Sequence, residues 1–154
     1  MWSFKRVVST RPVNVDIGLL VVRLGIGIIM AVFHGYGKLA AGPSLWAGIG
    51  SHMSNLGITF APVMWGFMAG MTEFFCSILL VLGVLFRPAA LFLAFTMFVA
   101  ALRHLNLPFD NPMSGWKGAS HALELLVVYL ALFFTGPGRY AATLILKPPR
   151  KPQP

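Results

Sequence analysis

The longest apolar stretch of the chain, residues 16–40, is long enough to cross a lipid bilayer. It reads DIGLLVVRLGIGIIMAVFHGYGKLA and contains Arg23, His34 and Lys38. A helix turns about 100° per residue, so these three side chains fall along one face and leave Leu, Val and Ile on the other. Ionisable groups inside a bilayer turn toward protein or enclosed water, because lipid does not solvate them. The stretch therefore predicts a membrane-spanning helix whose polar face meets other parts of the protein.

Three further apolar stretches, at about residues 62–86, 88–104 and 119–136, predict three more spans. The 154 residues are 57% hydrophobic and only 10% charged, whereas soluble domains carry about 25% charged residues. Between the first two spans, Pro43 suits a helix start and Gly57 a stop, which predicts a short interfacial helix. We therefore expect an all-α membrane protein, a bundle of four transmembrane helices in one domain over residues 16–140. This length leaves no room for a soluble catalytic domain.

The net charge of +8 reflects membrane topology, because the basic residues lie at the ends of the chain and in short loops. We therefore expect no nucleic-acid partner. One side of the predicted bundle carries eight basic residues, Lys5, Arg6, Arg11, Arg87, Arg139, Lys147, Arg150 and Lys151. The other side carries three, Lys38, Arg103 and Lys117. This asymmetry predicts that both termini are cytoplasmic, with a basic tail at 1–15 and a disordered Pro-rich tail at 141–154.

Most ionisable residues of the spans fall at one depth, in the outer half of the predicted bundle. They are His34, Lys38, Arg103, His104, His121 and Glu124. Such a concentration predicts a functional polar pocket open to the outer face, since histidine transfers protons near neutral pH. For Lys38 and Arg103 the alternative is that the long side chains reach the headgroups. His52, in the connecting helix, either covers the pocket or has no role.

Glu73 lies near the centre of the second predicted span. Gly66, Gly70 and Ser77 share its helical face, and small residues at this spacing let a neighbouring backbone approach closely. We therefore expect Glu73 to form a structural ion pair within the bundle. Its partner is either Arg23 or the edge formed by Lys38 and His34.

Cofactor chemistry based on cysteine or haem is not expected. The single cysteine, Cys76, excludes an intrachain disulfide and a thiolate metal site. His34, His104 and His121 lie on three helices at similar height, which is the kind of arrangement that can hold haem. Here they crowd the helix ends beside Lys and Arg, whose charge also repels a metal cation. We therefore expect neither a metal nor haem.

Several motifs of this chain resemble those of the DoxX family. The string RLGIGIIMAVFHGYGKL at 23–39 is similar to the opening helix of that family. Glu73 followed by LLVLGVLFRPAAL, LRHL at 102–105, the GW and Glu of 115–124, and TGPGRY at 135–140 follow in the family's order. The resemblance implies a four-helix protein of the bacterial inner membrane. It also implies an association with membrane oxidoreductase complexes, since members of the family are linked with them. One such complex is a quinone-reactive thiosulfate-oxidising enzyme in some archaea. In mycobacteria the family is linked to a stress assembly with sulfurtransferase and superoxide dismutase.

Three functions remain open. The first is a quinone-proximal subunit of an oxidoreductase, with His34, His121 and Glu124 supplying protons to the quinone. Lys38, Arg103 and His104 would bind the ligand and stabilise developing negative charge. The chain has no recognisable electron carrier, so a protein partner with redox centres would supply the electrons. The second is a non-catalytic anchor or assembly subunit, and the third is a small-solute or proton permease. The expected interaction partners are the lipid bilayer and, for the first function, that redox protein; association with further copies of the chain as a homo-oligomer also remains open.

Overall fold

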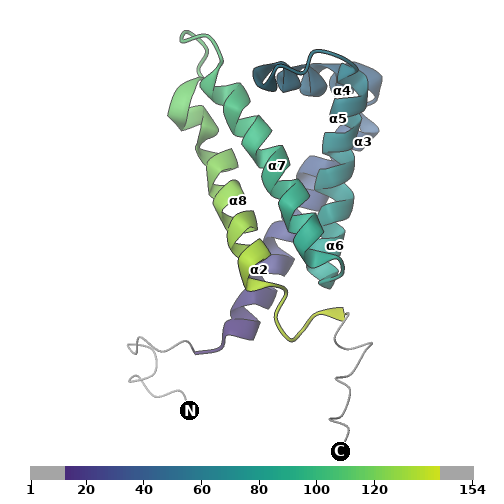
Figure 1. Ribbon diagram of the computed structural model, residues 1–154, viewed down its shortest axis with the longest axis vertical. Coiled ribbons are helices and arrows are strands. Elements are labelled where there is room, and N and C mark those ends of the chain that lie inside the picture. Colours follow the sequence, from purple (N-terminus) through teal and green to yellow (C-terminus); the bar gives the residue numbers. More distant parts are fainter. Residues whose placement is uncertain (1–12, 143–154) are drawn as a thin grey trace, which may run out of the picture.

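The computed structural model describes residues 13–142, and every regular element in this range is a helix. Four continuous helical segments are long and apolar enough to cross a membrane: Val15–Ala40, Pro62–Leu82, Phe86–Leu105 and Gly115–Thr135. The predicted all-α fold with four membrane spans is therefore confirmed, and the protein is a multi-pass membrane protein (Figure 1). The disordered tail predicted at 141–154 and the basic tail predicted at 1–15 lie, except for a few residues, outside the described range.

The first span consists of α2 (Val15–Ile29), the π-helical segment η1 (Met30–Gly35) and α3 (Tyr36–Ala40). It begins after Asn14, whose side chain accepts a hydrogen bond from the Ile17 N–H at 3.0 Å. Gly42, with φ +84°, then reverses the chain into α4 (Pro43–Gly50), which continues as the 3₁₀ segment η2 (Ser51–Leu56). This is the short helix predicted between the first two spans, and it ends at Gly57 as predicted.

The second span consists of α5 (Pro62–Met71), the π-helical segment η3 (Thr72–Cys76) and α6 (Ser77–Leu82). It ends earlier than predicted because Gly83 adopts the left-handed conformation, with φ +71°. Three residues link it to α7 (Phe86–Leu105). The fourth span, α8 (Gly115–Thr135), begins before the predicted residue 119. In its first turns Lys117 and Ser120 are exposed, so their polarity resembles a loop in the sequence although they are helical.

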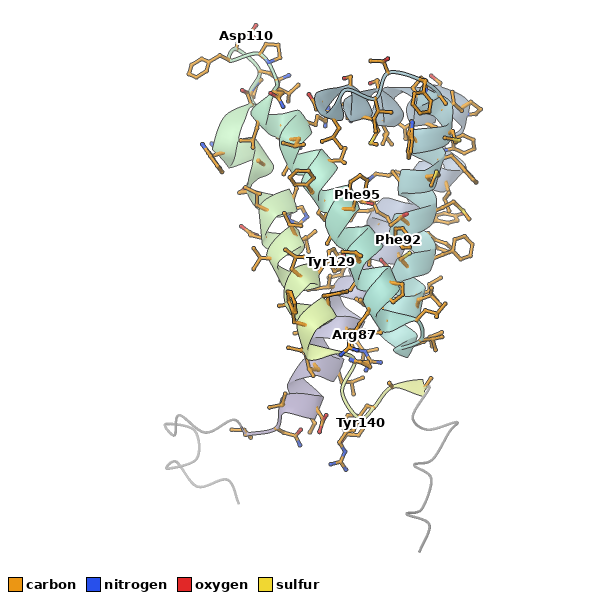
Figure 2. The ribbon with its side chains drawn as sticks, viewed as in Figure 1. Arg87, Phe92, Phe95, Asp110, Tyr129 and Tyr140 are labelled. Atoms are coloured by element: carbon orange, nitrogen blue, oxygen red, sulfur yellow. The ribbon has the colours of Figure 1, made fainter. Side chains whose placement is uncertain are left out.

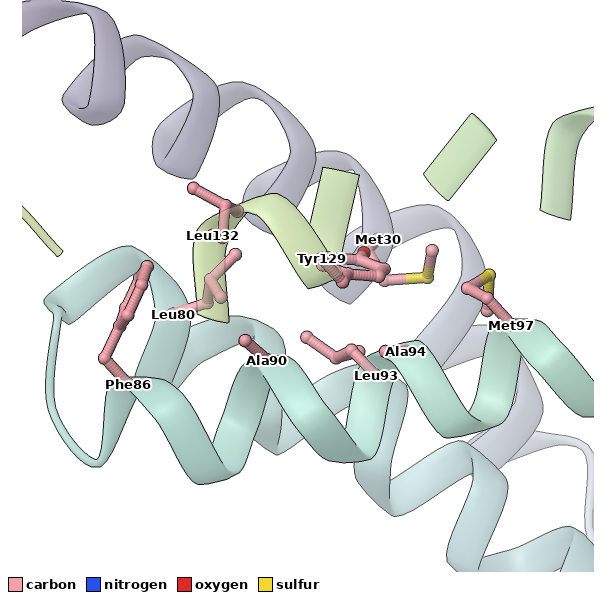
Figure 3. Packing of buried hydrophobic residues seen from close by; sticks show 9 residues of the cluster. All are labelled: Met30, Leu80, Phe86, Ala90, Leu93, Ala94, Met97, Tyr129 and Leu132. Carbon is pink, nitrogen blue, oxygen red and sulfur yellow. The ribbon is translucent and has the colours of Figure 1, made fainter. Parts of the chain in front are cut away.

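The apolar core lies where the four spans cross (Figure 3). Met30 of the first span, Leu80 of α6 and Tyr129 of α8 are buried together against Leu93 and Met97 of α7. Here α2 packs on α6, and η1 packs on η3. α7 packs along α8 over its length and also contacts η3 and η2. Beyond the core, α7 leans away from α5 and α4 lies across the end of α5 (Figure 1). We call this end of the bundle, which also carries the loop 106–114, the α4 end.

Two glycines fix α4 against α5. A Cβ atom at Gly50 would lie 1.8 Å from the Pro62 carbonyl oxygen, and one at Gly66 would lie 1.8 Å from that of Trp46. No other residue fits at either position without moving a backbone, so the two helices cross in direct contact. The Trp46 indole also donates a hydrogen bond of 2.7 Å to the Lys38 carbonyl. The α4–η2 helix is therefore tied to both of the first two spans.

Candidate functional site

A cavity of about 300 Å³ lies between the second span and α7, with η2 on its α4 side. Its wall is mainly apolar and includes Trp65 and Met68 from α5 and Phe92 and Phe95 from α7. Five ionisable residues also line it: Lys38, Glu73, His52, Arg103 and His104. This combination of an apolar wall and a few convergent polar groups is typical of small-molecule sites.

Lys38 and Glu73 form an ion pair at the deep end of the cavity. The Lys38 Nζ lies 2.5 Å from both carboxylate oxygens of Glu73, whose side chain is only 1% exposed. The pair joins α3 to η3, at a point where Gly35 lets the two backbones touch: a Cβ there would lie 2.5 Å from the Phe74 nitrogen. Of the two partners that the sequence left open for Glu73, the structure therefore places Lys38 against it.

Arg23 does not pair with Glu73, which corrects that alternative. Its guanidinium is 1% exposed and donates three hydrogen bonds to backbone carbonyls: Leu80 at 3.1 Å, Val81 at 2.7 Å and Pro137 at 2.5 Å. The last carbonyls of a helix lack intrahelical donors, and the negative end of the helix dipole favours a cation there. Arg23 therefore caps α6 and ties it to the segment after α8, at the end of the bundle opposite α4.

The α4 end of the cavity carries His52, Arg103 and His104. His104 Nδ1 lies 2.9 Å from the Met113 carbonyl, a contact that holds the imidazole against the loop 106–114. Burial lowers the pKa of His52 below its ordinary value, and the neighbouring charges of Arg103, His104 and Lys38 lower it further. His52 therefore favours its neutral form, in which one ring nitrogen remains an acceptor.

Two residues of the cavity wall carry a buried N–H group without a hydrogen-bond partner. They are Trp65, through its indole Nε1, and Arg103, through its Nε. Among the described residues no acceptor satisfies either group. A buried donor without a partner costs about 1–3 kcal/mol. Both nitrogen atoms are closed to water in this structure, so a ligand with acceptor oxygens would recover this free energy only after a side-chain rotation turned the N–H into the cavity.

The other three residues of the predicted polar cluster lie elsewhere. The rings of His34 and His121 face each other with centroids 6.1 Å apart, while His121 and Glu124 are exposed. None of the three lines the cavity. The predicted single pocket is therefore divided, because α8 packs on the side of α7 that faces away from the cavity. Depth along a helix does not say which neighbour a side chain faces, and in α8 the depth itself differs, because the helix begins at Gly115 and not at the predicted residue 119.

His52 and Glu73 both line the cavity. The sequence predicts for His52 either a covering role or none, and for Glu73 a structural ion pair. For His52, the feature of the sequence that indicates this place is a short helix with an apolar face, because such a face packs against other apolar residues. For Glu73, it is the position about 16 Å from the start of its helix, which a pocket opening at that end can reach.

The family assignment rests on the part of the chain that builds this cavity. The family model described as DoxX matches residues 18–105, more than half of the chain and the range that contains every residue lining the cavity. Searches of curated proteins and of solved structures found no match. The protein is a multi-pass membrane protein that belongs to the DoxX family.

Proposed function

We propose that this protein is the membrane subunit of a quinone-linked oxidoreductase complex and that its cavity binds the quinone headgroup. One observation carries the proposal. A mainly apolar, partly aromatic cavity within the membrane-spanning part holds an ion pair at its deep end and has two unpaired N–H donors in its wall. A quinone headgroup is a flat, apolar ring with carbonyl oxygens that accept hydrogen bonds, which matches both properties.

The size of the cavity supports a ligand of one or two rings. Its volume of about 300 Å³ lies at the lower end of the range for small-molecule pockets. Phe92, Phe95 and Trp65 offer ring contacts, which favour offset or edge-to-face packing against another ring. Lys38, Trp65 and Arg103 supply donors to carbonyl oxygens at the two ends of the cavity.

Reduction of a quinone to a quinol takes up two electrons and two protons. The protein partner with redox centres supplies the electrons. For the protons, we assign the deep end to the Lys38 ammonium of the Lys38–Glu73 pair and the α4 end to His104. Neutral His52 acts there as a relay, which accepts a proton from water at one ring nitrogen and passes on the proton of the other. Arg103 stabilises negative charge that develops on the nearer oxygen. This assignment replaces His34, His121 and Glu124, which lie outside the cavity.

A partner subunit is further supported by Glu124. This carboxylate is exposed on α8, nine residues from the start of the helix and so about 13 Å into the span. An ionised group facing lipid at such depth is costly, by about 2.5–3.5 kcal/mol at the centre of a bilayer. A neighbouring transmembrane helix with a basic or hydrogen-bonding side chain would remove this cost. The same observation favours the alternative function, an assembly subunit without chemistry.

The location that we propose is the bacterial inner membrane, with the α4 end facing away from the cytoplasm. The support is the distribution of Lys and Arg along the sequence. Cysteines introduced at Asn111, in the Cys76→Ser background, should react with an impermeant maleimide added to spheroplasts. Labelling that required permeabilised membranes would reverse the orientation.

Ligand binding by matched tryptophan variants tests the proposed function. Trp65→Phe removes an unpaired donor of the cavity wall and keeps the aromatic ring, so it should weaken binding of a short-tailed quinone about tenfold, or ~1.4 kcal/mol. Trp116→Phe is the control, since Trp116 is 75% exposed on α8. Calorimetric titration of the purified protein measures both. Absence of quinone binding to the unaltered protein would refute this role and leave the assembly subunit.

A further inference from the structure

We propose that the ligand enters the cavity sideways from the bilayer, between α5 and α7, and that its hydrocarbon tail stays in this opening. The inference rests on the proposed function and narrows its substrate class. The ligand is a membrane-resident quinone with a long hydrocarbon tail, and not a small aromatic carried by water.

The packing of α7 creates the opening. On one side of the cavity α7 contacts η3, and on the other it contacts η2. Between these two contacts it leans away from α5, and the cavity occupies the space between them (Figure 1). This wedge-shaped space between α5 and α7 is thus closed at its deep end by η3 and covered at the α4 end by η2.

The side of the wedge is lined by residues that also form the outer surface of the spans. Phe92 is 60% exposed, Phe95 45% and Met68 47%, although all three line the cavity. Figure 2 shows Phe92 and Phe95 on the stretch of α7 that passes the second span, and in the chain they alternate with the core residues Leu93 and Met97. The cavity wall is therefore continuous with a surface that faces acyl chains, and we call Phe92, Phe95 and Met68 the lateral opening.

The lateral opening is apolar and lies within the hydrocarbon layer. α5 and α7 run in opposite directions, so depth is counted here from the α4 end of each helix. Met68 lies about 9 Å inside α5, and Phe92, thirteen residues before Leu105, lies about 20 Å inside α7. Thr96 beside them donates its hydroxyl hydrogen to the Phe92 carbonyl at 3.0 Å, so it has no donor left for water. An apolar passage at this depth suits a hydrocarbon chain and excludes ions and water.

The α4 end, in contrast, is covered by a fixed element. Ile49, Gly50, His52 and Met53 of α4–η2 lie over the cavity. Gly50 and Gly66 hold this helix in backbone contact with α5, so entry from water would require the whole crossing to open. Entry from the bilayer requires only rotation of exposed Phe and Met side chains, which is fast.

The first experiment compares two benzoquinones with the same headgroup, one with a decyl tail and one without a tail. Stopped-flow binding to the protein in nanodiscs gives the association rate of each. Thr96→Trp should slow association of the tailed ligand about tenfold by filling the opening, and Phe92→Ala should speed it. Leu91→Trp is the control, because Leu91 is exposed on the same helix and does not line the cavity. Equal slowing of both ligands by Thr96→Trp, with no effect of Phe92→Ala, would overturn lateral entry.

A second measurement does not depend on any variant. A quinone with a photoreactive diazirine in its tail is bound to the unaltered protein, irradiated, and the labelled peptides are identified by mass spectrometry. Lateral entry predicts labels on the α5 and α7 peptides that contain Met68, Phe92 and Phe95. Labels confined to η2 or to the loop 106–114 would contradict it while leaving quinone binding intact. If neither of the two benzoquinones of the first experiment binds the unaltered protein, the proposed function fails as well.

Discussion

Lys38 and Glu73 form a buried ion pair that also lines the cavity. Both carboxylate oxygens of Glu73 already contact the Lys38 ammonium, so the pair is neutral overall while it lies at the deep end of the cavity. Replacing both partners of a buried ion pair by apolar residues is often neutral for stability, whereas removing one leaves an uncompensated charge. Single and double substitutions therefore separate the two roles.

Glu73→Gln should lower the free energy of unfolding by about 3–5 kcal/mol, because the Lys38 charge loses its partner. The double variant Lys38→Met with Glu73→Leu should recover most of that stability and still fail to bind quinone. Thermal unfolding of the purified protein, followed by circular dichroism, checks the first part, and calorimetric titration checks the second. Lys117→Met, on an exposed face of α8, is the control for loss of a lysine. A double variant that binds quinone as tightly as the original would limit the pair to a structural role.

His52 should make the stability of the protein depend on pH. Its pKa is lowered in the folded state by burial and by the charges of Arg103, His104 and Lys38. In the unfolded chain His52 takes up a proton near pH 6.5, while in the folded protein it remains neutral to lower pH. The free energy of unfolding should therefore fall as the pH is lowered through about 6.5, and His52 should not change it well above that pH.

Denaturant unfolding across this pH range measures the effect. His52→Gln should flatten the dependence relative to the original protein. The contribution of His52 is excluded if its substitution leaves the slope unchanged.

At the scale of elements, close backbone approach decides where the helices cross. Gly35 permits contact of η1 with η3, and Gly50 and Gly66 permit contact of α4 with α5. The two π-helical segments lie side by side at the first of these crossings, and such segments are frequent at functional sites. Lys38 follows η1 by less than one turn, and Glu73 lies within η3.

Gly50→Ala should displace α4 from α5 and so disturb the cavity, because the added Cβ would lie 1.8 Å from the Pro62 carbonyl oxygen. We expect lower stability and at least tenfold weaker quinone binding. Gly48→Ala in the same helix is the matched control, since a Cβ there meets nothing within 4 Å. It should stabilise the protein by about 0.5–1 kcal/mol, the usual gain from Gly to Ala in a helix. Thermal unfolding and titration of both variants test the pair, and equal behaviour would show that the crossing tolerates a methyl group.

For the whole molecule, the distribution of charge places two different surfaces on opposite sides of α7. One side holds the cavity, with its ion pair and with His52 and His104 at its α4 end. The other side holds α8, with His121 and Glu124 exposed. A protein that binds quinone on one side and a partner subunit on the other would use both surfaces. The two functions should then be separable by substitution.

Glu124→Gln should reduce recovery of the partner subunit from native membranes in mild detergent, because an ionic contact in the bilayer is lost. It should leave quinone binding and thermal stability of the isolated protein unchanged. Quantitative mass spectrometry of proteins that co-purify with the tagged chain measures the recovery. Trp65→Phe should give the opposite pattern, with full partner recovery and weaker quinone binding. Unchanged recovery with Glu124→Gln would remove α8 as the docking surface.

The sequence by itself determined the class of fold and the order of the polar groups along each span. Lengths of apolar runs set the four spans, and Pro43 and Gly57 bounded the connecting helix. The rise of about 1.5 Å per residue gives distances along each helix, which in α8 change with its start at Gly115 in place of the predicted residue 119. These are local properties, since they follow from the geometry of the covalent chain and from the partition of apolar side chains into lipid. The π-helical segments were not anticipated, because they depend on contacts between spans.

Only the tertiary structure decided which polar groups meet. Arg23 and Lys38 were both candidate partners for Glu73. The choice depended on the end of α6 at Gly83, because the last carbonyls of that helix accept hydrogen bonds from Arg23. His34 and His121 were placed with Lys38 and Arg103 by depth, yet α8 packs on the far side of α7 from the cavity. Depth is a one-dimensional quantity fixed along each helix, whereas neighbours depend on how helices rotate and cross. Those angles are set by close contacts such as Gly35 on Phe74 and Gly50 on Pro62, between residues that are separated in the chain.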